Sequence, residues 1–170
     1  ESRAFRAEPL PLQIVFEDEH LLVLDKPSGL LSVPGRDPAL SDSLMTRVQK
    51  QFPKALMINR LDKDTSGILL LARTDRVARR LSEAFRARTT RKIYWAAVAG
   101  VPSPAMGTVR FGLVKAPGHG RGGEGEKMIA VHPARVDQTE GAKRATTDYA
   151  VLDSLGTRVS WCALVPITGR

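Results

Sequence analysis

Cysteine and histidine are scarce in this 170-residue sequence. The single cysteine, Cys162, cannot close a disulfide within the chain, and the three histidines lie far apart, at His20, His119 and His132. Neither residue type follows the ligand spacing of a zinc site. We therefore expect a reducing, cytoplasmic setting and no bound metal.

Long apolar runs and aromatic side chains are also few. The stretch Ile68 to Ala72 has only the length of a strand. It falls far below the roughly 18 residues of a membrane span, so we expect no membrane contact. Aromatic residues make up 5% of the chain, fewer than a general binder of single-stranded nucleic acid normally uses to stack bases. The apolar share of 42% and the charged share of 26% are ordinary for a globular protein and exclude a disordered tail, a collagen-like chain or a coiled coil.

The chain is strongly basic. It has 26 basic and 18 acidic residues, a net charge of +8. This excess favours a polyanionic partner such as a nucleic acid. A basic surface that serves only solubility is the alternative.

Hydrophobic patterning predicts about eight strands and two helices. Helices are expected over 41–52, capped by Ser41, and from Thr74 or Asp75 to Arg88. Mostly adjacent strands with short connections predict an α+β fold with a mixed, mainly antiparallel sheet and a few flanking helices. A lead-in segment, 1–11, would precede one domain, 12–170. The expected strands are 12–16, 21–24, 56–61, 68–73, 92–98, 128–131, 146–155 and 158–165, with a further candidate at 109–114.

A highly polar segment, 59–67, separates two very apolar strands. Its core interleaves Arg60, Asp62, Lys63 and Asp64, although a strand connection needs only two to five ordinary turn residues. Fixed cations favour the ionised form of a nearby carboxylate, which suits a nucleophile or a charge-stabilising group. The alternative is a solvated turn with surface ion pairs, and the pattern does not decide which aspartate would act.

Two further segments carry charge or glycine. The arginine-rich helix at 75–88 could contact phosphates, with a merely solvated face as the alternative. The run 118–123 matches G-x-G-x-x-G formally, but a dinucleotide site needs a helix directly after it. Here a strand is expected at 128–131, so we predict a flexible loop and disfavour a dinucleotide-dependent enzyme.

Alternation along 92–98 places Lys92 and Tyr94 on one strand face and Ile93 and Trp95 on the other. A tyrosine that faces a site could stack on a base or move a proton. The alternative is a tyrosine half-buried at the edge of a sheet.

Five short motifs occur in an order that closely resembles the RluA-type RNA pseudouridine synthases. The resemblance runs from about residue 12 to the last residue. The motifs are Lys26-Pro27-Ser28-Gly29, Arg60-Leu61-Asp62 with Asp64-Thr65-Ser66-Gly67, Lys92-x-Tyr94-x-Ala96, Ala145-Thr146-Thr147-Asp148-Tyr149, and Thr168-Gly169-Arg170.

The resemblance implies an enzyme that converts uridine in RNA to pseudouridine. The N1–C1′ bond breaks, the uracil turns, and C5 bonds to C1′, after the nucleotide has been flipped out of its stack. It implies ribosomal or transfer RNA as partner, no cofactor and no metal, and we expect a monomer. A non-catalytic RNA-binding module on the same fold is the alternative.

The resemblance also implies roles for single residues. Asp62 matches the catalytic aspartate, which either attacks the ribose or enables glycal formation. Tyr94 matches the active-site tyrosine, and Arg170 matches the arginine that pairs with the catalytic carboxylate. The residues expected to bind RNA are Arg60, Lys63, Lys92 and Lys26.

The sequence departs from the family pattern at two places. Asn59 stands where a histidine is common, and because an amide cannot become cationic we expect no proton role there. The chain ends at Arg170, where a His-Gln-x-Arg continuation and further strands usually follow. We therefore expect the catalytic domain, 12–170, to be truncated at its C-terminal end.

Overall fold

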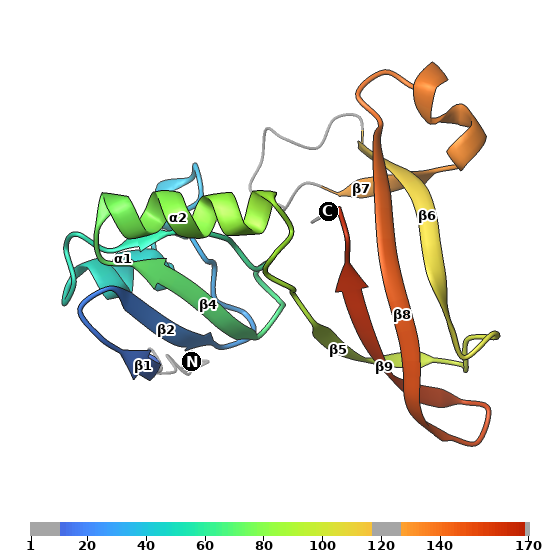
Figure 1. Ribbon diagram of the computed structural model, residues 1–170, viewed down its shortest axis with the longest axis horizontal. Coiled ribbons are helices and arrows are strands. Elements are labelled where there is room, and N and C mark those ends of the chain that lie inside the picture. Colours follow the sequence, from blue (N-terminus) through green and yellow to red (C-terminus); the bar gives the residue numbers. More distant parts are fainter. Residues whose placement is uncertain (1–10, 117–126, 169–170) are drawn as a thin grey trace, which may run out of the picture. The chain divides into compact units, whose positions relative to one another are not determined.

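The computed structural model describes residues 11–116 and 127–168, which form nine β-strands, two α-helices and two short 3₁₀ helices (Figure 1). The chain divides into two compact units, Glu1–Arg86 and Ala87–Arg170, each built around a sheet of its own. Every pairing between the named strands is antiparallel. The predicted α+β class with mainly antiparallel strands is confirmed. The strands form two separate sheets, one of four strands and one of five.

The first unit contains a four-stranded sheet. Its central strands bury alternate leucines completely, with Leu22 and Leu24 on one strand and Leu69 and Leu71 on the next. This alternation is why both segments form strands, because period-two apolar residues line one face of a sheet. The predicted hairpin at the start of the chain is confirmed. The order in the sheet is β1 (Gln13–Glu17), β2 (Leu21–Lys26), β4 (Gly67–Ala72) and β3 (Leu56–Met57).

The third strand is shorter than predicted. A strand was expected over 56–61, but β3 ends at Met57. The reason lies at Leu61, whose backbone N–H and carbonyl both bond to the hydroxyl of Ser32 instead of to a neighbouring strand. Residues 58–61 therefore belong to the loop that leads to Asp62.

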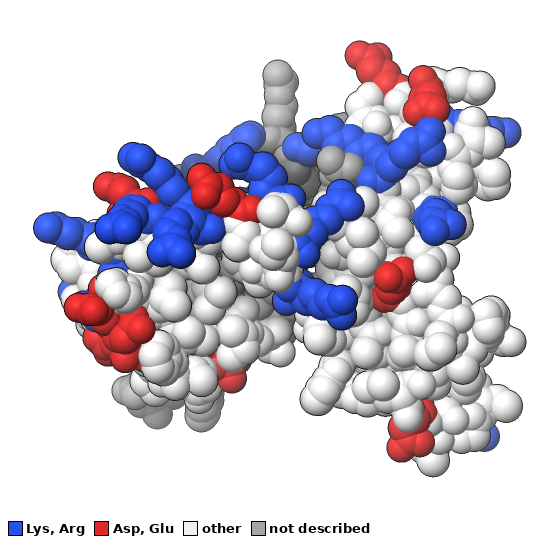
Figure 2. Space-filling model, in the orientation of Figure 1, with Lys and Arg blue, Asp and Glu red and all other residues white. Residues whose placement is uncertain are grey.

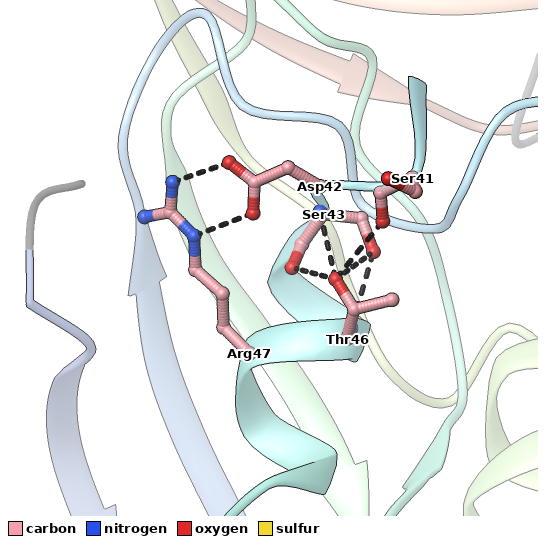
Figure 3. A network of polar contacts seen from close by, with 5 residues as sticks. All are labelled: Ser41, Asp42, Ser43, Thr46 and Arg47. Carbon is pink, nitrogen blue, oxygen red and sulfur yellow. Dashed lines mark hydrogen bonds and ion pairs between the residues drawn. The ribbon is translucent and has the colours of Figure 1, made fainter. Parts of the chain in front are cut away.

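Helix α1 (Leu44–Gln49) begins later than predicted, because Ser43 and not Ser41 caps it. The Ser43 hydroxyl accepts a hydrogen bond from the Thr46 N–H at 3.1 Å, and the Thr46 hydroxyl accepts one from the Ser43 N–H at 2.9 Å (Figure 3). Such a capping box satisfies two of the free N–H groups at a helix start. Beside it, the Arg47 guanidinium donates two bonds to the Asp42 carboxylate, at 2.8 and 2.7 Å.

Helix α2 (Asp75–Arg86) follows β4 after two residues and packs against β4 and β3. The Thr74 hydroxyl accepts a hydrogen bond from the Val77 N–H at 3.3 Å, as expected for a cap at Thr74. Neither α-helix in residues 11–116 and 127–168 has both the length and the apolar character needed to cross a membrane.

The second unit contains a five-stranded sheet. Its edge strand carries Trp95, whose ring meets that of Trp161 edge-on, with centroids 6.1 Å apart. A short 3₁₀ helix, η2 (Pro133–Gln138), places Val136 against the sheet, while η1 (Pro38–Leu40) belongs to the first unit. The glycine-rich run 118–123 lies outside the described residues. The order in the sheet is β5 (Tyr94–Ala99), β9 (Val159–Pro166), β8 (Lys143–Leu155), β6 (Met106–Lys115) and β7 (Met128–Val131).

Candidate active site

The loop that carries Asp62 makes a tight turn in the first unit. The Thr65 N–H donates to the Asp62 carbonyl at 3.1 Å, which closes the turn. Gly67 then begins β4 with φ of +124°. Residues other than glycine rarely adopt this backbone conformation. The Thr-Ser-Gly part of the motif therefore has a conformational reason: it returns the chain from the loop into the central sheet.

The end of β2 and the residues that follow it hold this turn through hydrogen bonds. The Lys63 carbonyl accepts hydrogen bonds from the Lys26 ammonium and from the Gly29 N–H, both at 2.9 Å. The Ser28 hydroxyl donates to the Asp64 carbonyl at 2.8 Å. Gly29 has φ of +87°, which explains the glycine in the Lys-Pro-Ser-Gly motif. Two of the five motifs are thus joined by hydrogen bonds to the backbone of the turn, one from a backbone N–H and two from side chains.

Ser32 holds the other side of the turn. Its buried hydroxyl donates to the Leu61 carbonyl at 2.6 Å and accepts from the Leu61 N–H at 3.1 Å. The Ser32 hydroxyl therefore satisfies both the N–H and the carbonyl of Leu61, the residue directly before Asp62. The sequence offered no signal for this role, since Ser32 belongs to none of the motifs.

Asp62 itself lies exposed between these fixed points. The backbone is bonded at the residue before it and at the two residues after it. The carboxylate remains accessible at the surface of the unit. A group that reacts with a bound substrate gains from a backbone held in one position, because less ordering is needed when the substrate arrives.

Lys26 differs from the predicted RNA contact. Its side chain is 0% exposed, and its ammonium donates to the carbonyls of Pro27, Leu30 and Lys63. Because an ammonium has three N–H donors, none remains for a phosphate. Burial lowers the pKa of Lys26, while the negative charges of Asp64 and then Asp62 act in the opposite direction. The residue is placed to position the loop.

Arg60 and Lys63 are both exposed on either side of Asp62. Their expected contacts with RNA stay predictions. Asn59 is partly buried, and its Oδ1 has no hydrogen-bond partner among the residues that the structure describes. The oxygen of the amide is therefore buried, and the expectation that Asn59 has no proton role stays a prediction.

The remaining predicted residues belong to the second unit. Tyr94 begins β5, pairs with Leu164 and is half-buried. Lys92 is half-buried as well, whereas Ile93 and Trp95 are 63% and 68% exposed, so the predicted alternation is confirmed. Arg170 lies outside the described residues. The structure thus brings Lys26, Arg60, Asp62 and Lys63 together in the first unit, and the roles of Tyr94 and Arg170 stay predictions.

Across residues 11–116 and 127–168 there is no cluster of three or more histidine, cysteine, aspartate or glutamate side chains placed to hold a metal ion. The turn thus presents two exposed carboxylates, Asp62 and Asp64, with the exposed cations Arg60 and Lys63 beside them.

Comparisons with known proteins agree on one family. A family model described as RNA pseudouridylate synthase matches residues 20–170. The dual-specificity RNA pseudouridine synthase RluA of Salmonella typhi is 42% identical over 162 residues, covering 94% of this chain and 67% of that protein. The same enzyme from Escherichia coli K12 is 41% identical with the same coverage.

Solved structures give the same answer for the fold. The human RNA pseudouridylate synthase domain containing 4 superposes with a TM-score of 0.70 at 29% identity, over 93% of this chain and 60% of its own length. The human domain containing 1 has a TM-score of 0.69 at 25% identity, over 96% of this chain and 64% of its own. The chain thus spans between 60 and 67% of the length of these relatives. With a family model over nearly the whole sequence and relatives above 40% identity, the chain belongs to the RNA pseudouridylate synthase family.

Proposed function

We propose that this chain carries the catalytic part of an enzyme that isomerises uridines in RNA to pseudouridine, with Asp62 as its essential carboxylate. The observation that carries the proposal is the exposed Asp62 carboxylate on a turn whose backbone is bonded on both sides. Family membership supports the reaction, and the match of Arg60-Leu61-Asp62 to the family motif supports the choice of residue.

The reaction rearranges one nucleotide without a change in its composition. The N1–C1′ bond breaks, the uracil turns, and a C5–C1′ bond forms, after which C5 loses its proton and N1 is protonated. A stacked base cannot turn in this way, so the uridine must first leave its stack. Asp62 then either attacks C1′ or enables formation of a glycal, and both routes need an ionised carboxylate held against the sugar.

Arg60 and Lys63 flank the carboxylate and would hold the phosphates of the flipped nucleotide. Tyr94 would stack near the base and assist removal of the C5 proton. Arg170 would pair with the carboxylate, which offsets the desolvation of a charge under a bound nucleotide. Lys26, Ser28 and Ser32 would act through the backbone of the turn, as positioning residues.

Loss of the C5 proton gives the experiment. RNA labelled with tritium at uridine C5 is incubated with the protein, and tritium in water is counted. Since the bacterial relatives are named dual-specificity RNA pseudouridine synthases, ribosomal and transfer RNA are tested separately. The informative variant is Asp62→Asn, and the matched control is Asp64→Asn, an exposed aspartate two residues further along the same turn.

We expect release from the wild type and from Asp64→Asn, and no release from Asp62→Asn although it still binds RNA. Normal release by Asp62→Asn would show that another group does the chemistry. Binding of RNA by the wild type with no release from either RNA class would favour the non-catalytic binding module.

A further inference from the structure

The arginines of α2 lie together on one side of the helix. At about 100° of rotation per residue, all four fall within an arc of about 120°, and the apolar residues of the helix fall within the opposite arc. All four are exposed, while Val77, Leu81 and Phe85 are partly covered. This set, which we name the arginine stripe, consists of Arg76, Arg79, Arg80 and Arg86.

The arginine stripe is not neutralised by its neighbours. Glu83 lies three or four residues from Arg79, Arg80 and Arg86, the spacing at which helix ion pairs form. No ion pair of any of the four with a carboxylate occurs within the part of the chain that the structure describes. Elsewhere, the exposed Asp42, Glu17 and Asp137 do pair with arginines. The stripe therefore carries four arginine charges against one glutamate, Glu83, and Figure 2 shows blue side chains gathered over α2 with red ones among them.

The sequence segment that begins with α2 carries a large share of the net charge. Residues 75–92 contain seven basic and two acidic side chains, a net +5, against +8 for the whole chain. Within α2 every basic residue is an arginine. The guanidinium group is planar and holds phosphate oxygens in pairs, which makes it better suited than lysine to such contacts.

The stripe leads toward the turn that carries Asp62. Helix α2 begins two residues after β4 ends, packs against that strand and runs back along it (Figure 1). The helix is about 18 Å long and the strand about 20 Å, so the Arg86 end returns to the Gly67 end. Gly67 follows Asp62 by five residues in the same unit. A chain of phosphates that reaches the Asp62 turn can continue over α2.

We propose that the arginine stripe is a second RNA surface, which binds the sugar–phosphate backbone next to the target uridine without reading its sequence. The inference rests on the proposed function, because it assumes that RNA lies at Asp62. Phosphate contacts of this kind supply affinity and orientation, while base recognition is left to other groups. An anionic membrane is a poorer fit, since the apolar side of α2 is turned toward β4 and β3 and could not enter lipid.

The test compares two triple variants with the same change in charge. The first is Arg76→Gln with Arg79→Gln and Arg80→Gln. The control is Arg110→Gln with Arg135→Gln and Arg158→Gln, three exposed arginines of the second unit that form no ion pair within the described ranges. Binding of a fluorescein-labelled RNA stem-loop with uridines in its loop is followed by fluorescence anisotropy between about 50 and 200 mM salt.

The slope of log K against log salt is negative, and each lost phosphate contact lowers its magnitude by about 0.7–0.9. The α2 triple should therefore lower the magnitude of the slope by about 2–3. The control triple should lower it by less than the value for a single contact. Equal losses in the two triples would overturn the proposal, because net charge alone would then explain them. An α2 triple that keeps the wild-type slope but no longer binds vesicles of anionic phospholipid would overturn it in favour of a membrane.

Tritium release separates this inference from the proposed function. If the wild type releases tritium and the α2 triple shows the wild-type salt dependence of RNA binding, the proposed reaction is supported and the second RNA surface is refuted. If the wild type releases no tritium and the α2 triple still shows a weaker salt dependence of RNA binding, the stripe is supported as an RNA-binding surface and the proposed reaction is refuted.

Discussion

The Nζ atom of Lys26 lies 2.9 Å from the carbonyl oxygen of Lys63, which is 37 residues further along the chain. The same ammonium bonds the carbonyls of Pro27 and Leu30. One buried cation thus ties the end of β2 to the turn that presents Asp62. A hydrogen bond from a charged donor is stronger than one between neutral groups, and here it acts on the backbone directly after the candidate catalytic residue.

Replacement of this ammonium should loosen the turn. Lys26→Met keeps the length of the side chain but removes three hydrogen bonds. Among the described residues, only the Lys63 carbonyl keeps a second donor, the Gly29 N–H, so the free energy of unfolding should fall by ~2–4 kcal/mol. Urea denaturation followed by circular dichroism measures this free energy. Tryptophan fluorescence is unsuitable for the first unit, because Trp95 and Trp161 both belong to the second. Lys54→Met, at an exposed lysine of the first unit, is the control. Equal stability of the two variants would refute the structural role of Lys26.

Ser32 should be as important as its buried hydroxyl suggests. Ser32→Ala removes both hydrogen bonds to Leu61 and leaves a buried N–H and carbonyl unpaired, at a cost of about 1–3 kcal/mol. Because the turn would then be less well held, the rate of tritium release should fall as well. Ser154→Ala, at an exposed serine, should change neither quantity. A Ser32→Ala protein with wild-type stability would mean that water replaces the lost bonds.

Stability in acid should depend in part on Asp42. The bonds from Arg47 hold the pKa of Asp42 below its usual value, so the carboxylate stabilises the folded state above about pH 4. That contribution is lost as the pH falls through the folded-state pKa. The Asp42 side chain is 62% exposed, so the contribution is under ~1 kcal/mol and shrinks with added salt.

The check is the difference in unfolding free energy between the wild type and Asp42→Asn at a series of pH values. It should be positive near neutral pH and shrink toward zero in acid. A difference that stays constant over this range would assign the effect to packing instead of charge.

Arg88 has φ of 58°, the one positive value among the non-glycine residues that the structure describes. It follows the end of α2, a position where glycine is usual. Arg88→Gly should therefore raise the free energy of unfolding by about 0.5–1 kcal/mol. Arg80→Gly, at an exposed position inside the helix, should lower it by a similar amount. The opposite signs make thermal unfolding of the pair decisive: a fall in both would exclude relief of strain at Arg88.

Local patterns predicted those parts of the fold that depend on nearby residues. The hairpin of β1 and β2 follows from two short apolar runs, and α2 follows from Val77, Leu81 and Phe85 on one face. The helix start at Ser43 was missed because Ser41 and Ser43 are equivalent as caps in sequence. Only the bond that closes the capping box with Thr46 separates them.

For the site, the motif order was sufficient to single out Asp62, and the family to which it points is confirmed. The function of Lys26 was not predicted correctly, since a lysine in a polar motif gives no sign of being fully buried. Ser32 was not predicted at all, because its partner Leu61 is 29 residues away.

The sequence by itself thus determined the family and the antiparallel α+β class, and it singled out Asp62 as the candidate catalytic aspartate, since these inferences depend on residue types and short spacings. The tertiary structure alone decided which groups hold the turn and which remain exposed. The physical reason is that a buried hydrogen bond joins groups that the fold brings together, and Lys26, Ser32 and the turn around Asp62 meet only when β2 pairs with β4.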